Sequence, residues 1–209
     1  MEPPGTLTVP SETHLLRSCC RAAERADIVA RGLDGLRVAL SETFHSHLIA
    51  LAEEIRGSAR QLRDLVDRSQ LFILRVPLIS NYLGVLLPCL SRSLGDITAH
   101  YDDKALSREI RWRKMYNKMT EEAGGLPLPQ RFVLYNTFLS LLRELLTRYR
   151  ASRLHPGMTT SPDALLSRSP SFDLNNLETL HTRILSLREK RGIRESPAAE
   201  FVCLPALTL

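Results

Sequence analysis

An almost wholly apolar helical pattern occupies residues 132–146, FVLYNTFLSLLRELL. Ten of these fifteen residues are apolar, and the other five fall within one narrow arc when residues are placed about 100° apart around a helix. The five polar residues are Asn136, Thr137, Ser140, Arg143 and Glu144. A helix that is apolar around most of its surface belongs in the middle of a bundle, with neighbours on several sides. Pro129, whose missing N–H costs nothing in a first turn, predicts its start.

Two longer helices are predicted earlier in the chain. Ser11 is a suitable cap for a helix over residues 12–31, and Gly32 and Gly35 predict a break after it. A long amphipathic helix then extends over about 36–74, because its apolar positions recur at close to the period of a straight α-helix. Those positions are Leu36, Leu40, Phe44, Leu48, Leu51, Ile55, Ala59, Leu62 and Val66.

The window 71–90, LFILRVPLISNYLGVLLPCL, is the most apolar of the chain and has two interpretations. About 20 apolar residues suffice to cross a membrane. Arg75, however, is costly in lipid, and Pro77 and Pro88 interrupt a helix. We therefore expect a buried helix–turn–helix, in which Pro77 ends or kinks the long helix and Pro88 starts the next one. A membrane-associated segment is the alternative.

Two shorter helices complete the pattern. After a turn or cap at Asp102 and Asp103, the first spans about 104–122 and ends at the Ala-Gly-Gly sequence that follows. Its inner face is Trp112, Met115, Tyr116 and Met119. The last helix is predicted to start at Asn175, with Glu178 completing a capping box, and to end before a glycine at the C′ position. That glycine is Gly192.

Proline-rich and polar segments divide the chain. Residues 1–10 and 194–209 are predicted to be flexible tails, and 149–169 a disordered loop before the last helix. We hypothesise that this loop is an insertion, even translated intron sequence, because excising 149–168 would leave a link of ordinary length between two helices. The predicted fold is all-α: a single bundle of about six helices over 11–193.

Composition and charge narrow the class of protein. Hydrophobic residues make up 44% of the chain, which allows a sizeable core. Lys and Arg number 28 against 23 Asp and Glu, and the resulting +5 gives only weak support for nucleic acid or an anionic membrane as partner. The chain has four cysteines, and no two of them form a C-x-x-C motif. The N-terminal segment lacks the pattern of a secretory signal. We expect reduced thiols in an intracellular protein, cytoplasmic or nuclear.

Recognisable catalytic and ligand-binding motifs are missing from the sequence. His45 and His47 are two positions apart and point to different faces of a helix, whereas a helical metal pair needs a spacing of three or four. The sequence has no H-E-x-x-H, no Cys/His cluster, no G-x-S-x-G and no phosphate-binding loop. We expect no metal, no cofactor and no enzymatic activity.

Two kinds of candidate site follow from local patterns. Arg111, Lys114 and Lys118 share one face of the helix over 104–122, beside its aromatic residues. Such a face can bind an anionic ligand, and a solvated basic face next to a buried aromatic one explains the pattern equally well. Ser-Pro dipeptides in predicted loops are candidate phosphorylation sites. They begin at Ser161, Ser169 and Ser196.

Three segments, 110–116 (IRWRKMY), 124–146 and 169–193, resemble a group of uncharacterised all-helical proteins from filamentous fungi. The long predicted helix is also broadly similar to the helical N-terminal regions that precede nucleotide-binding modules in fungal STAND-type proteins. Neither resemblance implies a catalytic residue. Together they imply an adaptor or signalling-type helical domain.

The function predicted from these observations is a non-catalytic, helical protein–protein interaction or regulatory module with a protein partner. The alternative is a membrane-associated or pore-forming helical protein that uses residues 71–90. An enzyme ranks third, because nucleophile, paired-carboxylate and metal motifs are missing at recognisable spacing.

Overall fold

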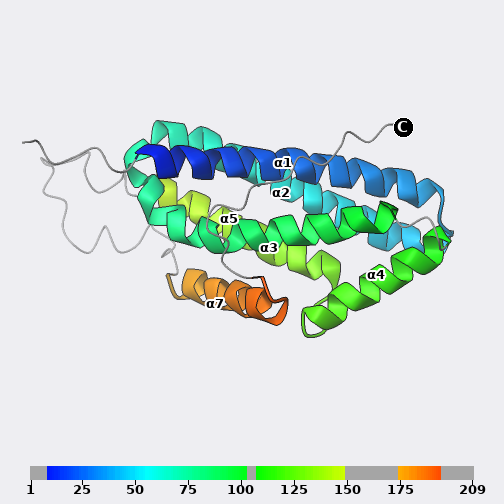
Figure 1. Ribbon diagram of the computed structural model, residues 1–209. Helices are drawn as coiled ribbons and strands as arrows, with labels where there is room; N and C mark the ends of the chain where they lie inside the picture. The colour runs from blue at the N-terminus through cyan, green and yellow to red at the C-terminus, as the bar shows by residue number, and fades with distance from the viewer. Residues whose placement is uncertain (1–8, 103–106, 149–173, 194–209) are drawn as a thin grey trace, which may run out of the picture.

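The computed structural model describes residues 9–102, 107–148 and 174–193. Over these ranges the chain forms six α-helices, two short 3-10 helices and no strand, which confirms the predicted all-α bundle (Figure 1). The elements are α1 (Val9–Val38), η1 (Glu42–Phe44), α2 (His45–Leu71), η2 (Ile73–Arg75), α3 (Val76–Asp102), α4 (Arg108–Glu122), α5 (Leu128–Arg148) and α7 (Leu174–Lys190).

The central position predicted for the apolar helix is confirmed. α5 contacts α2, α3, α4 and α7, so it has neighbours on several sides. Its large side chains Phe132, Tyr135, Phe138 and Leu142 are fully buried. Pro129 is the second residue of α5, as predicted from its missing N–H. Asn136, from the polar arc, is also buried, where its side-chain amide donates to the Glu54 carbonyl oxygen of α2 at 2.9 Å.

The first predicted break is wrong. α1 starts at Val9, so Ser11 is not its cap and residues 9–10 do not belong to a tail; the helix then passes through both glycines. Leu33, between the two glycines, and Leu36, beyond them, are buried in the core. Burying a leucine gains about 1.5–3 kcal/mol, more than the roughly 1 kcal/mol that a helical glycine costs relative to alanine, so tertiary packing continues the helix.

The long second helix therefore starts later than predicted, at His45, and the first three of its predicted apolar positions precede it. The remaining stripe of α2 is correct. Its predicted core positions are all buried: Leu48, Leu51, Ile55, Ala59, Leu62 and Val66.

The helix–turn–helix predicted in the apolar window exists, but both prolines occupy unexpected positions. α2 ends at Leu71, before Pro77, which lies instead in the first turn of α3. Pro88 is inside α3 and starts no helix. An internal proline costs about 3 kcal/mol, and the apolar residues on both sides of Pro88 that pack into the core offset it. Arg75 closes the turn by donating to the Leu146 carbonyl oxygen of α5 at 2.9 Å.

The glycine helix ends are confirmed and the caps are corrected. Gly124 and Gly192 have φ of 66° and 59°, a conformation that glycine adopts at little cost at the C′ position. The cap of α4 is Ser107, not the predicted aspartates, of which Asp102 is the last residue of α3. α7 starts at Leu174, so Asn175 is already helical, and Glu178 accepts a hydrogen bond from the Tyr82 hydroxyl at 3.3 Å.

Candidate functional site

A small surface pocket of about 160 Å³ opens between η1, the first turn of α2 and the middle of α4. It lies at the end of the bundle where α1 turns into α2, on the right in Figure 1. Two adjacent rows of α4, each with a spacing of four residues, form one wall, because residues i and i+4 lie above one another on a helix. The residues lining the pocket are Phe44, His47, Trp112, Arg113, Tyr116 and Asn117.

Aromatic rings form the walls of this pocket. Trp112 is only 2% exposed, and its ring centroid lies 6.1 Å from that of Tyr116. Phe44, the last residue of η1, contributes the opposite ring and is half-buried. Burial raises the pKa of the Tyr116 hydroxyl, so this group stays protonated at neutral pH and can donate a hydrogen bond.

Polar groups lie at the rim of the pocket. Arg113 places its guanidinium 5.1 Å from the centroid of the Phe44 ring and donates to the Glu109 carboxylate at 2.7 Å. Its charge is thus compensated, and the pocket is close to neutral. His47 and Asn117 are exposed beside it. A cavity of similar size in another protein holds a benzene ring, so this pocket can take one bulky apolar side chain or a single ring.

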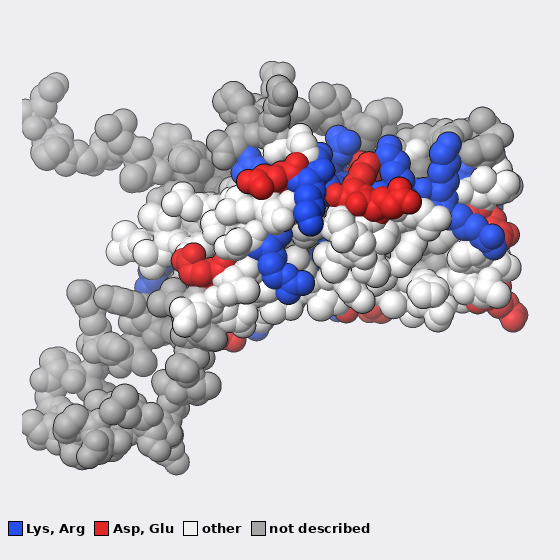
Figure 2. Space-filling model, turned by 90° about the horizontal axis from the view of Figure 1, so that it is seen from below, with Lys and Arg blue, Asp and Glu red and all other residues white. Residues whose placement is uncertain are grey.

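The predicted basic face lies away from this pocket. With about 100° between successive residues, Arg111, Lys114 and Lys118 fall on the other flank of α4 from Arg113 and Asn117. Lys118 lies 3.8 Å from the Glu122 carboxylate, and Arg111 is half-buried. On the face that Figure 2 shows, Lys and Arg side chains alternate with Asp and Glu. None of the three predicted residues lines the pocket, so the structure does not bring the basic face to it.

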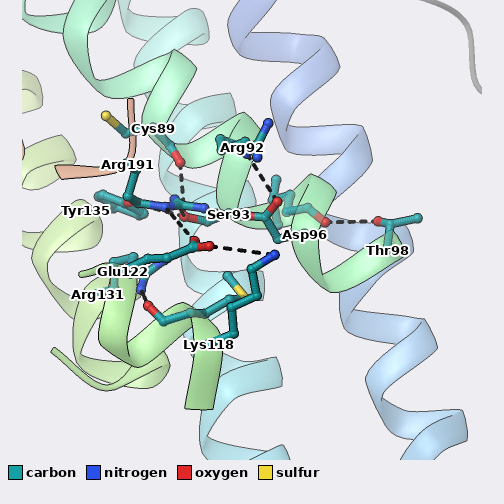
Figure 3. A network of polar contacts seen from close by, with 12 residues as sticks. Cys89, Arg92, Ser93, Asp96, Thr98, Lys118, Glu122, Arg131, Tyr135 and Arg191 are labelled. Atoms are coloured by element: carbon teal, nitrogen blue, oxygen red, sulfur yellow. Dashed lines mark hydrogen bonds and ion pairs between the residues drawn. The ribbon is translucent and has the colours of Figure 1, made fainter. Parts of the chain in front are cut away.

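A buried polar network lies where α3, α5 and the ends of α4 and α7 meet (Figure 3). Arg191, just after α7, is its centre, and its side chain is only 2% exposed. It pairs with the Asp96 carboxylate, donates to the Ser93 hydroxyl at 2.9 Å, and lies 3.9 Å from the Glu122 carboxylate. The Ser93 hydroxyl also lies 3.2 Å from the hydroxyl of Tyr135. This one arginine connects the end of α7 directly with α3 and α4, and with α5 through the Ser93 hydroxyl.

Burial dominates the proton affinities in this network. It raises the pKa of Tyr135 to about 12 and that of the Cys89 thiol to about 11, so neither is a nucleophile at neutral pH. It also raises the pKa of Asp96, against the opposing effect of Arg191, and lowers that of Arg131. Arg131 donates to the Met119 carbonyl oxygen, while its Nε and Nη1 have no hydrogen-bond partner in the part of the chain that is described. The network has the character of a structural clamp.

Sequence reasoning found part of these sites. It placed Trp112 and Tyr116 on the inner face of their helix, beside the candidate anionic-ligand face. Phe44 was assigned to the apolar stripe of the long predicted helix. In the sequence, the pocket is indicated only by Arg113 and Asn117, which lie one turn apart beside the aromatic residues Trp112 and Tyr116. This pattern does not reveal that η1 packs against the same face of α4.

The structure bears on the histidines and on possible metal ligands, but not on the candidate phosphorylation sites. Among the described residues, no three His, Cys, Asp or Glu side chains are grouped as they would be around a metal ion. His45, close to the pocket, has its ring Nε2 3.1 Å from the Leu40 carbonyl oxygen. The predicted loop, the C-terminal tail and the candidate phosphorylation sites lie outside the described residues. Those sites are Ser161, Ser169 and Ser196.

Among the described residues one helical stretch, Ile73–Ala99, which begins in the apolar window and comprises η2 and most of α3, is long and apolar enough to cross a membrane by length and composition. Several of its side chains are committed to the bundle, since Ile79, Leu83 and Leu90 are fully buried. Buried residues make up 39% of the most apolar part of this stretch, so packing in the bundle explains a part of its apolar character.

Comparisons with known proteins identify no relative. No protein-family model matches the chain, and no curated protein or solved structure matches it at a significant level. The resemblance to fungal helical proteins therefore stays a prediction, and the function has to be inferred from the geometry.

Proposed function

We propose that this chain is a non-catalytic, intracellular helical module that binds a protein partner through the aromatic pocket between η1 and α4. The observation that supports this most directly is the grouping of Trp112, Tyr116 and Arg113 around one surface hollow. These three residue types are the ones most enriched among the residues that dominate binding energy at protein interfaces.

The size and polarity of the pocket indicate what the partner inserts. A volume of about 160 Å³ matches one leucine, methionine or phenylalanine side chain rather than a whole cofactor. The rim offers the His47 ring and the Asn117 amide, both exposed, for hydrogen bonds to the partner's backbone. An apolar anchor surrounded by polar contacts is the usual anatomy of a protein interface.

The residues deeper in the bundle support a role without catalysis. Cys89 and Tyr135 are the strongest candidate nucleophiles near the buried network, and both are held protonated by burial. The resemblance to helical N-terminal regions of fungal STAND-type proteins supports an adaptor or signalling role. This proposal carries no resident metal or cofactor.

The test is a selection of random displayed peptides on the intact protein, followed by titration of the enriched peptides. Trp112 is the only tryptophan of the chain, so its emission reports occupation of the pocket by any peptide without tryptophan. We expect enriched peptides to share one bulky apolar residue. Phe44→Ala should weaken their binding by about tenfold or more, since it removes most of one wall.

Ile49→Ala is the matched control, because Ile49 is 44% exposed on α2 and does not line the pocket. It should leave the affinity unchanged. The proposal fails if no peptide is enriched, or if both variants weaken binding equally. A photo-crosslinker at Asn117, compared with one at the exposed Thr137 of α5, then captures the natural partner through the same site.

A further inference from the structure

A cluster of exposed aliphatic side chains surrounds the α2–α3 turn. Leu71 is 78% exposed, Leu74 93%, Leu78 52% and Ile73 47%. Single exposed hydrophobic residues are normal on a protein surface, and the other large ones described here are dispersed over α1, α2, α4 and α5. Four within eight consecutive residues form a patch, and such patches mark interaction sites. We call these four residues the aliphatic tip.

The position of the tip suits a deformable partner. It occupies a turn at the end of the bundle opposite to the aromatic pocket, on the left in Figure 1. A projecting turn is convex, and lipid acyl chains adapt to a convex shape. A protein partner would need a complementary hollow to gain the same contact.

Part of the backbone of the turn is hydrogen-bonded. The Phe72 amide donates to the Arg68 carbonyl oxygen at 3.0 Å, and the Arg75 amide donates to the Phe72 carbonyl oxygen at 2.8 Å. Paired backbone groups lose little when water is removed, whereas unpaired ones are costly in lipid. These hydrogen bonds lower the cost of placing the turn in the interface of a bilayer, where water remains for its other backbone groups.

The charge of the tip favours an anionic surface. Arg75 is the only charged residue in the whole stretch 69–91, so the tip has no carboxylate of its own. The Arg75 guanidinium lies 5.0 Å from the centroid of the Phe72 ring, at the base of the turn. Arg75 is half-buried and donates to the Leu146 carbonyl oxygen of α5, so it acts as a fixed positive charge at the base of the turn, and such a charge attracts anionic lipids over a short distance. The chain as a whole is also positive, at +5.

We propose that the aliphatic tip docks this protein on anionic membrane surfaces by shallow insertion, while the bundle stays folded. Leu71, Ile73, Leu74 and Leu78 enter the interface, while Arg75 keeps its contact with Leu146 and holds its positive charge at the base of the turn. The helix that follows remains in the bundle, because Ile79 and Leu83 are fully buried. The protein thus lies on the membrane and does not span it. This restricts membrane contact in the apolar window to its first eight residues and is independent of the aromatic pocket.

Co-sedimentation of the intact protein with vesicles tests this proposal. We expect binding to vesicles of phosphatidylcholine with phosphatidylserine, and weaker binding to phosphatidylcholine alone. Leu74→Glu should lower the partition coefficient by tenfold or more, because it places a carboxylate at the most exposed position of the tip. Its melting temperature should stay near that of the unmodified protein, which separates lost docking from lost folding.

Val38→Glu is the matched control, since Val38 is 82% exposed at the other end of the bundle. It adds the same charge and should keep most of the binding. Three results would overturn the proposal. The unmodified protein could stay in the supernatant with both vesicles, or the two variants could lose equal binding. Pelleting that resists high salt, with α3 protected from added protease, would show a spanning helix instead.

A protein occupant is also distinguished by this experiment. If vesicles do not bind but Leu74→Glu abolishes capture of a specific protein, the tip belongs to that protein's interface and the lipid proposal is wrong. Loss of peptide binding at the aromatic pocket leaves the vesicle result unaffected, so the two proposals fail separately.

Discussion

The two ends of α2 are built alike and expose different surfaces. Each is preceded or followed by a three-residue 3-10 helix, η1 at one end and η2 at the other. At η1, Phe44 faces α4 and forms part of an aromatic pocket with a polar rim. At η2, Arg75 is tied to the Leu146 carbonyl oxygen, while Ile73 and Leu74 face solvent.

The difference shows how a neighbouring helix turns an apolar turn into a selective site. α4 packs over η1 and adds Trp112, Tyr116 and Arg113, so the surface there has shape and hydrogen-bonding groups. Aliphatic residues at η2 offer only apolar area, which does not discriminate between partners of similar hydrophobicity. The first end suits recognition of one side chain, and the second suits a surface such as lipid.

The largest expected effect comes from disrupting the helix that supports both ends. Leu142→Ala removes a fully buried side chain of α5 and should cost about 2–5 kcal/mol of unfolding free energy. That is a large share of the roughly 5–15 kcal/mol that stabilises a domain. Urea unfolding measures it, with Glu144→Ala on the same helix as control. Equal losses in the two variants would show that α5 is not central.

A second, more local effect is expected from Arg191→Ala. Breaking a fully buried ion pair lowers the free energy of unfolding by about 3–5 kcal/mol. Here we expect a loss of about 2–3 kcal/mol, because the Asp96 side chain is 23% exposed and keeps a second partner, Arg92, at 3.2 Å. The control is Arg92→Ala, since Arg92 pairs with the same carboxylate while 62% exposed, and should cost at most about 1 kcal/mol.

Hydrogen exchange should localise the Arg191 effect. α4 and α7 should exchange faster in Arg191→Ala, because the arginine joins both to α3, while the α2–α3 turn should be unaffected. Faster exchange at both ends of the bundle would contradict the view that the two ends are independent.

The third prediction compares one phenylalanine from each end. Phe44→Ala should lower the free energy of unfolding by about 1–2 kcal/mol. This is less than the roughly 3–5 kcal/mol lost with a fully buried phenylalanine, because Phe44 is half-buried. The substitution should also expose Trp112 to an added quencher. Phe72→Ala, at the other turn, should leave the tryptophan signal unchanged. If Phe72→Ala exposes Trp112 equally, the two ends are coupled through the bundle.

The smallest effect on stability is expected at the aliphatic tip. Leu74→Ser should change the unfolding free energy by no more than about 0.5 kcal/mol, because the side chain is 93% exposed. It should nevertheless reduce binding of a hydrophobic dye. Calorimetry and dye fluorescence measure the two effects, and a loss well above 1 kcal/mol would mean that Leu74 is packed.

The sequence by itself determined the all-α class and the buried stripes of several helices. The apolar periods of α2, α4 and α5 identified buried residues correctly, including Trp112, Met115 and Met119. The ends of α4 and α7 at glycine were equally readable. These features depend on neighbours within about four residues and on a positive φ that glycine adopts most easily, so a local pattern records them.

Only the tertiary structure decided where α1 ends, that Pro88 lies inside a helix, and which residues meet at the sites. In the first two cases the local cost of a glycine or a proline in a helix competes with the burial of apolar side chains against another helix, and burial prevails. The third case depends on which helix faces pack together. Arg191 pairs with Asp96, which is 95 positions away, and Phe44 faces Trp112. No local pattern encodes that choice, because it is set by the packing of the whole bundle.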